Sequence, residues 1–236
     1  MILPLLLAAA APAMTSPACV ALTRADPARA AATAQAWRAN GGGLAARHCE
    51  GLAQVAQERW TEATRTFSQA ATDAEAERDG RAADLWVQAG NAALAGGDPA
   101  LARQLLDRAT ALPVLSDPMR GEALLDRARA GVALGDFAGA RADLDRALAL
   151  VPADPMAWLL SATLARRMKD VARARTDIAQ AVRRAPDDPA VALEQGNVAA
   201  VAGSGAEAMA AWGRAARLGP ETAEGRAAAQ AMAANR

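Results

Sequence analysis

The chain has 236 residues, of which 53% are hydrophobic and only 3% aromatic, and it contains no tyrosine. Many of the hydrophobic residues are alanines, and an alanine-rich composition favours closely packed helices. The formal net charge is zero, so no overall field attracts nucleic acid or an anionic membrane surface.

Residues 1–18 are predicted to be a signal peptide or another N-terminal leader. The stretch 1–13 is apolar and ends in Ala11-Pro12-Ala13, which fits a small-x-small cleavage site. It is shorter than the ~20 residues of a membrane span. Because no basic residue precedes it, an N-terminal anchor or a misassigned start codon stays open. We expect an exported, periplasmic protein with no integral span in the mature chain, or a cytoplasmic protein if the leader is not a signal peptide.

Residues 19–43 are predicted to be an N-terminal segment with one extra helix. This helix runs over residues 27–40 and ends at three consecutive glycines, residues 41–43. Aspartate caps helices and proline suits the first helical turn, so Asp-Pro pairs predict helix starts. Such pairs begin at Asp26, Asp98, Asp117, Asp154 and Asp188.

A period of 34 residues runs through the second half of the chain. Pro152, Pro186 and Pro220 follow this spacing. Small or apolar residues repeat with the same shift, in the sets Ala140, Ala174 and Ala208; Ala147, Ala181 and Ala215; and Leu144, Ile178 and Trp212. A fixed period of this length indicates stacked helix–turn–helix units. We therefore expect an all-α, right-handed superhelical solenoid of stacked antiparallel helix hairpins.

The hairpin over residues 154–187 resembles the tetratricopeptide repeat. The residues at the signature positions of that family are Trp158, Ala162, Ala174, Ile178, Ala181 and Pro186. In the same register we expect about five repeats, at residues 44–80, 81–116, 117–153, 154–187 and 188–220, followed by a capping helix in residues 221–236. Trp158 is expected to be buried between the helices. Within the family, the chain resembles bacterial exported members.

The resemblance implies binding of a protein or peptide partner in a concave groove lined by the first helix of each hairpin. The register assigns Gln88, Asn91, Leu125, Asp126, Arg129, Met156, Leu159, Thr163, Arg166, Glu194 and Asn197 to this groove. Asn91 and Asn197 stand where some peptide-binding members contact ligand backbone. Arg129 and Arg166 could receive an acidic group, although Asp126 and Glu194 share the wall. The lysine-rich set that clamps a terminal carboxylate in chaperone-binding members is missing.

The single histidine and the two cysteines are the candidates for metal binding or thiol chemistry. His48 lacks the partners that a zinc site needs, so a structural role in the first hairpin is favoured. Cys19 and Cys49 are the only cysteines. An even number in an exported chain favours a disulfide, whereas a cytosolic chain would keep two unpaired thiols.

The sequence contains no nucleophile elbow, phosphate-binding loop or paired catalytic acids, so an enzyme is not expected. No metal or other cofactor is expected either. The favoured function is a non-catalytic scaffold in the cell envelope, with an unidentified protein or peptide partner and no nucleic acid. The alternative is a self-assembling structural or assembly factor that acts by stacking its repeats. The oligomeric state stays open.

Overall fold

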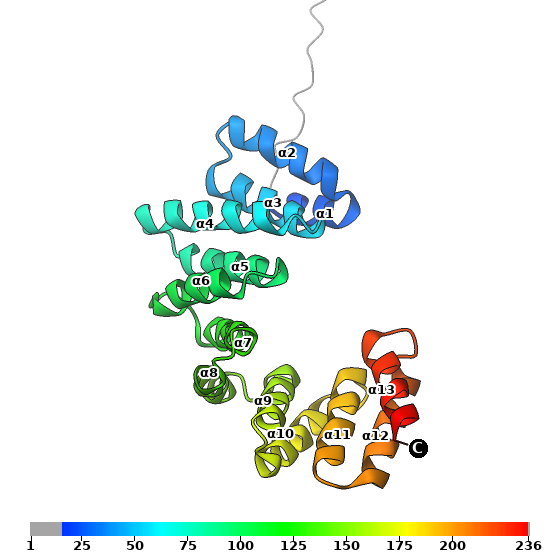
Figure 1. Ribbon diagram of the computed structural model, residues 1–236. Helices are drawn as coiled ribbons and strands as arrows, with labels where there is room; N and C mark the ends of the chain where they lie inside the picture. Colours follow the sequence, from blue (N-terminus) through cyan, green and yellow to red (C-terminus); the bar gives the residue numbers. More distant parts are fainter. Residues whose placement is uncertain (1–15, 236) are drawn as a thin grey trace, which may run out of the picture. The chain divides into compact units, whose positions relative to one another are not determined.

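The computed structural model describes residues 16–235, so the predicted cleavage site at Ala11-Pro12-Ala13 lies outside the described residues. Every regular element in residues 16–235 is an α-helix, thirteen in all (Figure 1). Consecutive helices within residues 16–96, and likewise within residues 97–235, pack on one another, which confirms the predicted all-α class and the stacked hairpins. None of the described helices combines the length and the hydropathy needed to span a bilayer.

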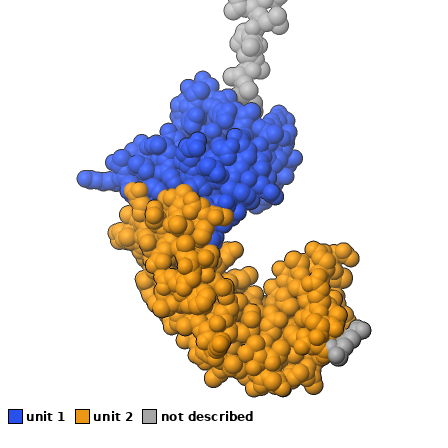
Figure 2. Space-filling model, in the orientation of Figure 1, with its two compact units in different colours: residues 1–96 blue, residues 97–236 orange. Residues whose placement is uncertain are grey.

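The chain divides into two compact units, residues 1–96 and 97–236 (Figure 2). The helices of unit 1 are α1 (Ser16–Ala25), α2 (Pro27–Ala39), α3 (Gly43–Ala56), α4 (Trp60–Ala76) and α5 (Ala82–Ala95). Those of unit 2 are α6 (Pro99–Ala111), α7 (Asp117–Ala133), α8 (Phe137–Leu150), α9 (Pro155–Arg167), α10 (Val171–Arg184), α11 (Pro189–Val201), α12 (Gly205–Leu218) and α13 (Ala223–Ala234).

The residues that repeat every 34 positions form the core of unit 2. Helices α7 and α8, α9 and α10, and α11 and α12 form three hairpins. The repeating alanines and the larger residues between them are all buried, at 4% exposure or less; they are Ala140, Ala174, Ala208, Ala147, Ala181, Ala215, Leu144, Ile178 and Trp212. Small side chains let the helices of a hairpin approach, and the larger ones fill the space beside the crossing.

Most of the predicted aspartate caps are present. The side chains of Asp26, Asp98, Asp154 and Asp188 each accept a hydrogen bond from a backbone N–H in the first turn of the following helix. Asp117 differs, because α7 begins at this residue and Ser116 takes the N-cap position. The prediction that Asp117 caps a helix is therefore wrong.

The two ends of the described chain differ from the prediction in extent. The sequence predicts one helix between residues 19 and 43, yet in the structure α1 precedes α2 there. α1 was missed because residues 16–25 carry no capping signal and follow no repeat. At the other end, the capping helix begins at Ala223, where the Thr222 side chain accepts a hydrogen bond from the Gly225 N–H at 3.1 Å.

Three tight turns join the helices of the three hairpins in unit 2. Gly135 and Gly203 have φ angles of +80° and +77°, and Lys169 has +64° at the equivalent turn, 34 residues from each. Glycine adopts this left-handed region without a Cβ penalty, whereas lysine does not. The middle hairpin therefore contains a strained turn residue where its neighbours have glycine.

The tryptophans are buried to different extents. Trp86 on α5 is 2% exposed, and its indole N–H donates to Glu75 on α4 at 2.5 Å. Trp158 on α9 is only half-buried, and its indole N–H donates to the Pro152 carbonyl at 2.9 Å. The guanidinium of Arg184 lies 5.0 Å from the centre of its ring. The expectation that Trp158 is a buried core residue is therefore wrong.

Candidate binding site

Several residues that the register assigns to a groove are instead internal. Leu125 is 5% exposed and Leu159 is 7% exposed, and both belong to hydrophobic clusters of the hairpins. Neither side chain is available to a ligand, so both leave the set of candidate binding residues. A repeat register fixes the helix but not which of its side chains the neighbouring hairpin covers.

Arg166 is also engaged within the protein. Its Nε donates to Oε1 of Glu194 at 2.6 Å, and its Nη2 donates to Oε2 at 3.0 Å. Asn197 donates to the same carboxylate at 3.1 Å and accepts a hydrogen bond from the Trp212 indole at 3.0 Å. Glu194 is only 6% exposed. These side chains join α9, α11 and α12, so an acidic ligand would have to break an internal ion pair to reach Arg166.

Two of the remaining candidates of unit 2, Arg129 and Thr163, line a small cavity of about 220 Å³, which we call the α7–α9 pocket. It is lined by Ala128, Arg129, Val132, Leu144, Leu160, Thr163, Leu164 and Arg167, which belong to α7, α8 and α9. Ala128, Leu144 and Leu164 are each 1% exposed and form its floor. Val132, Leu160 and Thr163 are half-buried. Met156, also at the start of α9, is 46% exposed but does not line the pocket.

Two arginines on neighbouring hairpins border the α7–α9 pocket. The Arg129 side chain is 57% exposed, and its Nη1 donates to Asp126 at 3.0 Å. Arg167 is exposed, and its guanidinium lies 5.0 Å from the ring centre of Phe137. Within residues 16–235, no carboxylate forms an ion pair with Arg167. Both guanidinium groups therefore keep N–H donors for a ligand.

Arg167 and the apolar lining residues are not among the residues that the repeat register assigns to the groove. Arg166 and Arg167 are adjacent, and successive residues on a helix point about 100° apart, so only one of them can face this pocket. The two arginines are distinguished by Glu194 on α11, the first helix of the following hairpin, because Glu194 forms an ion pair with Arg166.

In unit 1, the predicted residues Gln88 and Asn91 line a second cavity of about 310 Å³, the α3–α5 pocket. Its other lining residues are Leu52, Val55, Trp60, Phe67, Ala92 and Ala95. Oε1 of Gln88 accepts a hydrogen bond from Nε2 of His48 at 2.9 Å, and Asn91 is exposed. The polar groups of this pocket are neutral amides, in contrast to the cationic border of the α7–α9 pocket.

His48 connects α3 to α5 and is half-buried. Burial lowers the pKa of His48 below its usual value of 6.5, and the positive charge of Arg81 acts in the same direction. The hydrogen bond with Gln88 and the charge of Asp84 oppose this shift. Among the described residues, no group of three or more His, Cys, Asp or Glu side chains could hold a metal ion.

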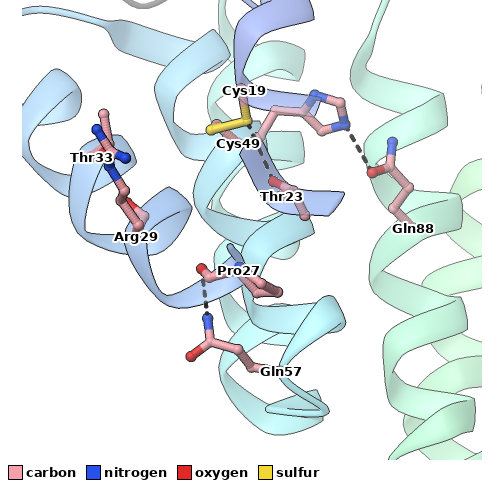
Figure 3. The surroundings of a disulfide bond; sticks show 9 residues. Cys19, Thr23, Pro27, Arg29, Thr33, Cys49, Gln57 and Gln88 are labelled. Carbon is pink, nitrogen blue, oxygen red and sulfur yellow. Dashed lines mark hydrogen bonds between the residues drawn. A yellow bond between two sulfur atoms is a disulfide. The ribbon is translucent and has the colours of Figure 1, made fainter. Parts of the chain in front are cut away.

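Cys19 on α1 and Cys49 on α3 are joined by a disulfide in the structure, with their Cα atoms 5.8 Å apart (Figure 3). Both residues are 1% exposed. The bridge closes a loop that contains α2. Gln57, just after α3, donates a hydrogen bond to the carbonyl of Pro27 at the start of α2, at 3.1 Å. The first three helices thus form one covalently closed bundle.

Models of the tetratricopeptide repeat match residues 49–114, 87–155 and 131–196. Together these matches cover residues 49–196, which is more than half of the chain. The sequence matches none of the curated proteins.

Many solved structures share the fold. PilW, titled a widely conserved type IV pilus biogenesis factor, has a TM-score of 0.75 at 19% identity, and the match covers 90% of this chain and 95% of PilW. PilF from Pseudomonas aeruginosa has a TM-score of 0.73 at 17% identity, covering 94% and 97%. YrrB, titled a TPR protein with an unusual peptide-binding site, has a TM-score of 0.58 at 16% identity, covering 83% and 96%. At these identities the likeness establishes the fold alone.

Proposed function

The chain belongs to the tetratricopeptide repeat family, and we propose that it is a non-catalytic scaffold that binds a protein or peptide partner at the α7–α9 pocket. The observation that carries this proposal is the combination of an apolar cavity with two arginines, Arg129 and Arg167, that retain free donors on neighbouring hairpins. The titles of PilW and YrrB, a biogenesis factor and a protein with a peptide-binding site, support the same class of function.

The size of the pocket favours a peptide side chain over a small molecule. Pockets for drug-sized ligands usually measure about 300–1,000 Å³, whereas this cavity holds about 220 Å³. One aliphatic side chain fits a space of this size, and the rest of such a ligand would lie across the exposed surfaces of α7 and α9. The scaffold would therefore recognise a segment of polypeptide by one anchored residue and its neighbours.

Export of the protein is part of the proposal. Two features support it: the apolar stretch before Ala13 and the disulfide between Cys19 and Cys49. Disulfides persist in oxidising compartments such as the periplasm and are rare in the cytosol. Cell fractionation followed by N-terminal sequencing tests this part, since cleavage after Ala13 leaves Met14 as the first residue. An intact N-terminus in a cytosolic fraction would contradict it.

Site-specific photo-crosslinking in the native cell tests the binding site. A benzophenone side chain at Thr163 should give adducts with another polypeptide, because Thr163 lines the pocket and is half-buried. The control position is Arg183, which is exposed on α10 and does not line the pocket. Equal adducts at both positions, or none at Thr163, would overturn the site.

The same experiment separates the scaffold from self-assembly through repeat stacking. In the background Arg129→Glu, Arg167→Glu, the adducts at Thr163 should disappear while the molar mass by light scattering stays unchanged. Adducts that consist of a second copy of this chain, together with a change in molar mass, would favour self-assembly instead.

A further inference from the structure

We infer that the α7–α9 pocket selects an internal peptide segment in which an aliphatic side chain stands next to an acidic one. This inference rests on the proposed function and defines the chemistry of the ligand. It follows from three properties of the pocket: its floor, its charge and the kind of backbone that surrounds it.

The floor requires an apolar side chain. Ala128, Leu144 and Leu164 are almost fully buried and offer no polar group to the cavity. A polar side chain placed there would lose its hydrogen bonds to water without replacement. Burial of an aliphatic side chain is favourable in free energy. A cavity of about 220 Å³ also suits one aliphatic side chain better than a large aromatic one.

The border supplies positive charge. Arg129 and Arg167 come from different helices, and the pair between Arg129 and Asp126 offsets part of their positive charge. That pair uses Nη1 of Arg129, so the remaining N–H groups can donate to a second acceptor. The guanidinium of Arg167 lies over the ring of Phe137, 5.0 Å from its centre, so the N–H groups at the guanidinium edge can bind a carboxylate. Guanidinium groups bind carboxylates in planar, charge-assisted pairs.

The hydroxyl of Thr163 adds one acceptor at the same border. Its Oγ1 donates to the Leu159 carbonyl at 2.9 Å, so its proton is used and its lone pairs face other donors. A backbone N–H of the bound segment is a suitable donor. The pocket therefore offers positions for an aliphatic side chain, a carboxylate and a peptide N–H.

The walls favour an internal segment over a chain terminus. Proteins commonly capture a terminal carboxylate with free backbone N–H groups arranged as a nest. Here the lining residues lie inside α7, α8 and α9, where backbone N–H groups are already used by the helices. Only side chains can meet the anion, and they can reach a side-chain carboxylate of a segment that continues in both directions.

Selection from a library of random 12-residue peptides tests the inference on the full chain. The peptides are fused to phage coat protein through their C-termini, so none presents a free terminal carboxylate. We expect enrichment of sequences with Asp or Glu adjacent to Leu, Ile, Val or Met. The enriched peptides should lose binding to the variant Arg129→Glu, Arg167→Glu and keep it with the control Arg183→Glu, which makes the same kind of charge change on α10.

A variant in which the pocket is filled distinguishes two outcomes: that the ligand is not of the acidic–aliphatic class, and that the α7–α9 pocket is not the binding site. Thr163→Trp should abolish binding of the enriched peptides, and Val132→Trp serves if the first variant unfolds, since both positions are half-buried. Peptides that still bind both filled variants would refute the site itself. Peptides that are excluded by the filled variants but are neutral or basic would refute the acidic–aliphatic class alone.

Binding measurements with synthetic peptides whose termini are blocked then give the contribution of each peptide residue to affinity. In the best enriched sequence, replacing the acidic residue by its amide should weaken binding about tenfold, as loss of a charge-assisted hydrogen bond does. Replacing the aliphatic residue by alanine should also weaken binding at least about tenfold. A free-carboxylate version of the peptide that binds much more tightly than the blocked one would overturn the choice of an internal segment.

Discussion

The Arg166 guanidinium on α9 binds both carboxylate oxygens of Glu194 on α11, at 2.6 and 3.0 Å, and so joins two consecutive hairpins. Glu194 is almost completely buried, whereas a quarter of the Arg166 side chain is exposed. Adjacent repeats in this part of the chain therefore share a polar contact as well as an apolar interface.

Removal of Arg166 should destabilise the protein. Breaking a fully buried pair costs about 3–5 kcal/mol, and the partial exposure of Arg166 reduces this to about 1–3 kcal/mol for Arg166→Met. Urea denaturation followed by circular dichroism measures the change. Arg183→Met is the control and should stay within about 0.5 kcal/mol. A coupled pair makes the loss in the double variant Arg166→Met, Glu194→Met smaller than the sum of the losses in the two single variants, so a loss equal to that sum would contradict the coupling.

The tryptophans should differ in their contribution to stability. Trp86→Ala removes a buried ring and should cost about 3–5 kcal/mol. Trp158→Ala should cost less than about 2 kcal/mol, because the ring is half-buried and remains in contact with water. Denaturant titration of both variants checks the ranking. Equal losses of unfolding free energy in the two variants would show that the exposed fraction of each ring does not determine its contribution to stability.

Lys169→Gly should stabilise the protein by up to about 1 kcal/mol. The φ angle of Lys169 is +64°, and a side chain in this left-handed region costs about 1–2 kcal/mol, part of which is offset by the greater freedom of glycine in the unfolded chain. Thermal unfolding measures the gain. Lys169→Ala keeps the Cβ atom and should give no such gain, so a similar rise in both variants would exclude relief of strain.

Acidification should weaken unit 1 through His48. Burial holds the pKa of His48 in the folded protein below the usual 6.5, so the unfolded chain binds more protons between the two values. The stability contributed by neutral His48 is present above pH 6.5 and is lost as pH falls through the lowered pKa. Denaturation at several pH values should show stability rising with pH in this window.

His48→Gln is the matched variant for this test, since an amide can keep a hydrogen bond with Gln88 but does not titrate. It should flatten the pH dependence. His48 is the only histidine, so its imidazole resonances report the pKa without overlap. A measured pKa above 6.5 would contradict the prediction.

Loss of the bridge between Cys19 and Cys49 should destabilise the N-terminal bundle. The sequence separation is 30 residues, for which the chain-entropy model gives about 3–4 kcal/mol. Denaturation of the variant Cys19→Ser, Cys49→Ser against the oxidised wild type measures the difference. Non-reducing mass analysis of the purified protein comes first, because two alkylatable thiols in the exported protein would refute the pairing.

Periodicity was enough to predict the hairpins of unit 2. Ala140, Ala174 and Ala208 repeat because every hairpin needs a small residue at the same crossing, and the structure buries all three. The N-terminal helix α1 could not be predicted in this way, since its position depends on contacts with α2 and α3 and not on a repeat.

The binding site was less predictable than the fold. The register named Arg129 and Thr163, which line the α7–α9 pocket, but also Leu159, which is buried. It placed Arg166 at the surface and overlooked Arg167. Whether an arginine is free depends on the residue that faces it from the next hairpin, and spacing along one helix carries no information about that partner.

The covalent link between α1 and α3 has a mechanical consequence. With the bridge in place, tension applied to the chain ahead of Cys19 passes through the two sulfur atoms to Cys49. The residues between them, including all of α2, then lie outside the path of the force. A pull from the N-terminal side would therefore load the solenoid directly at α3, and α2 would stay folded until the load exceeded what α3 itself withstands.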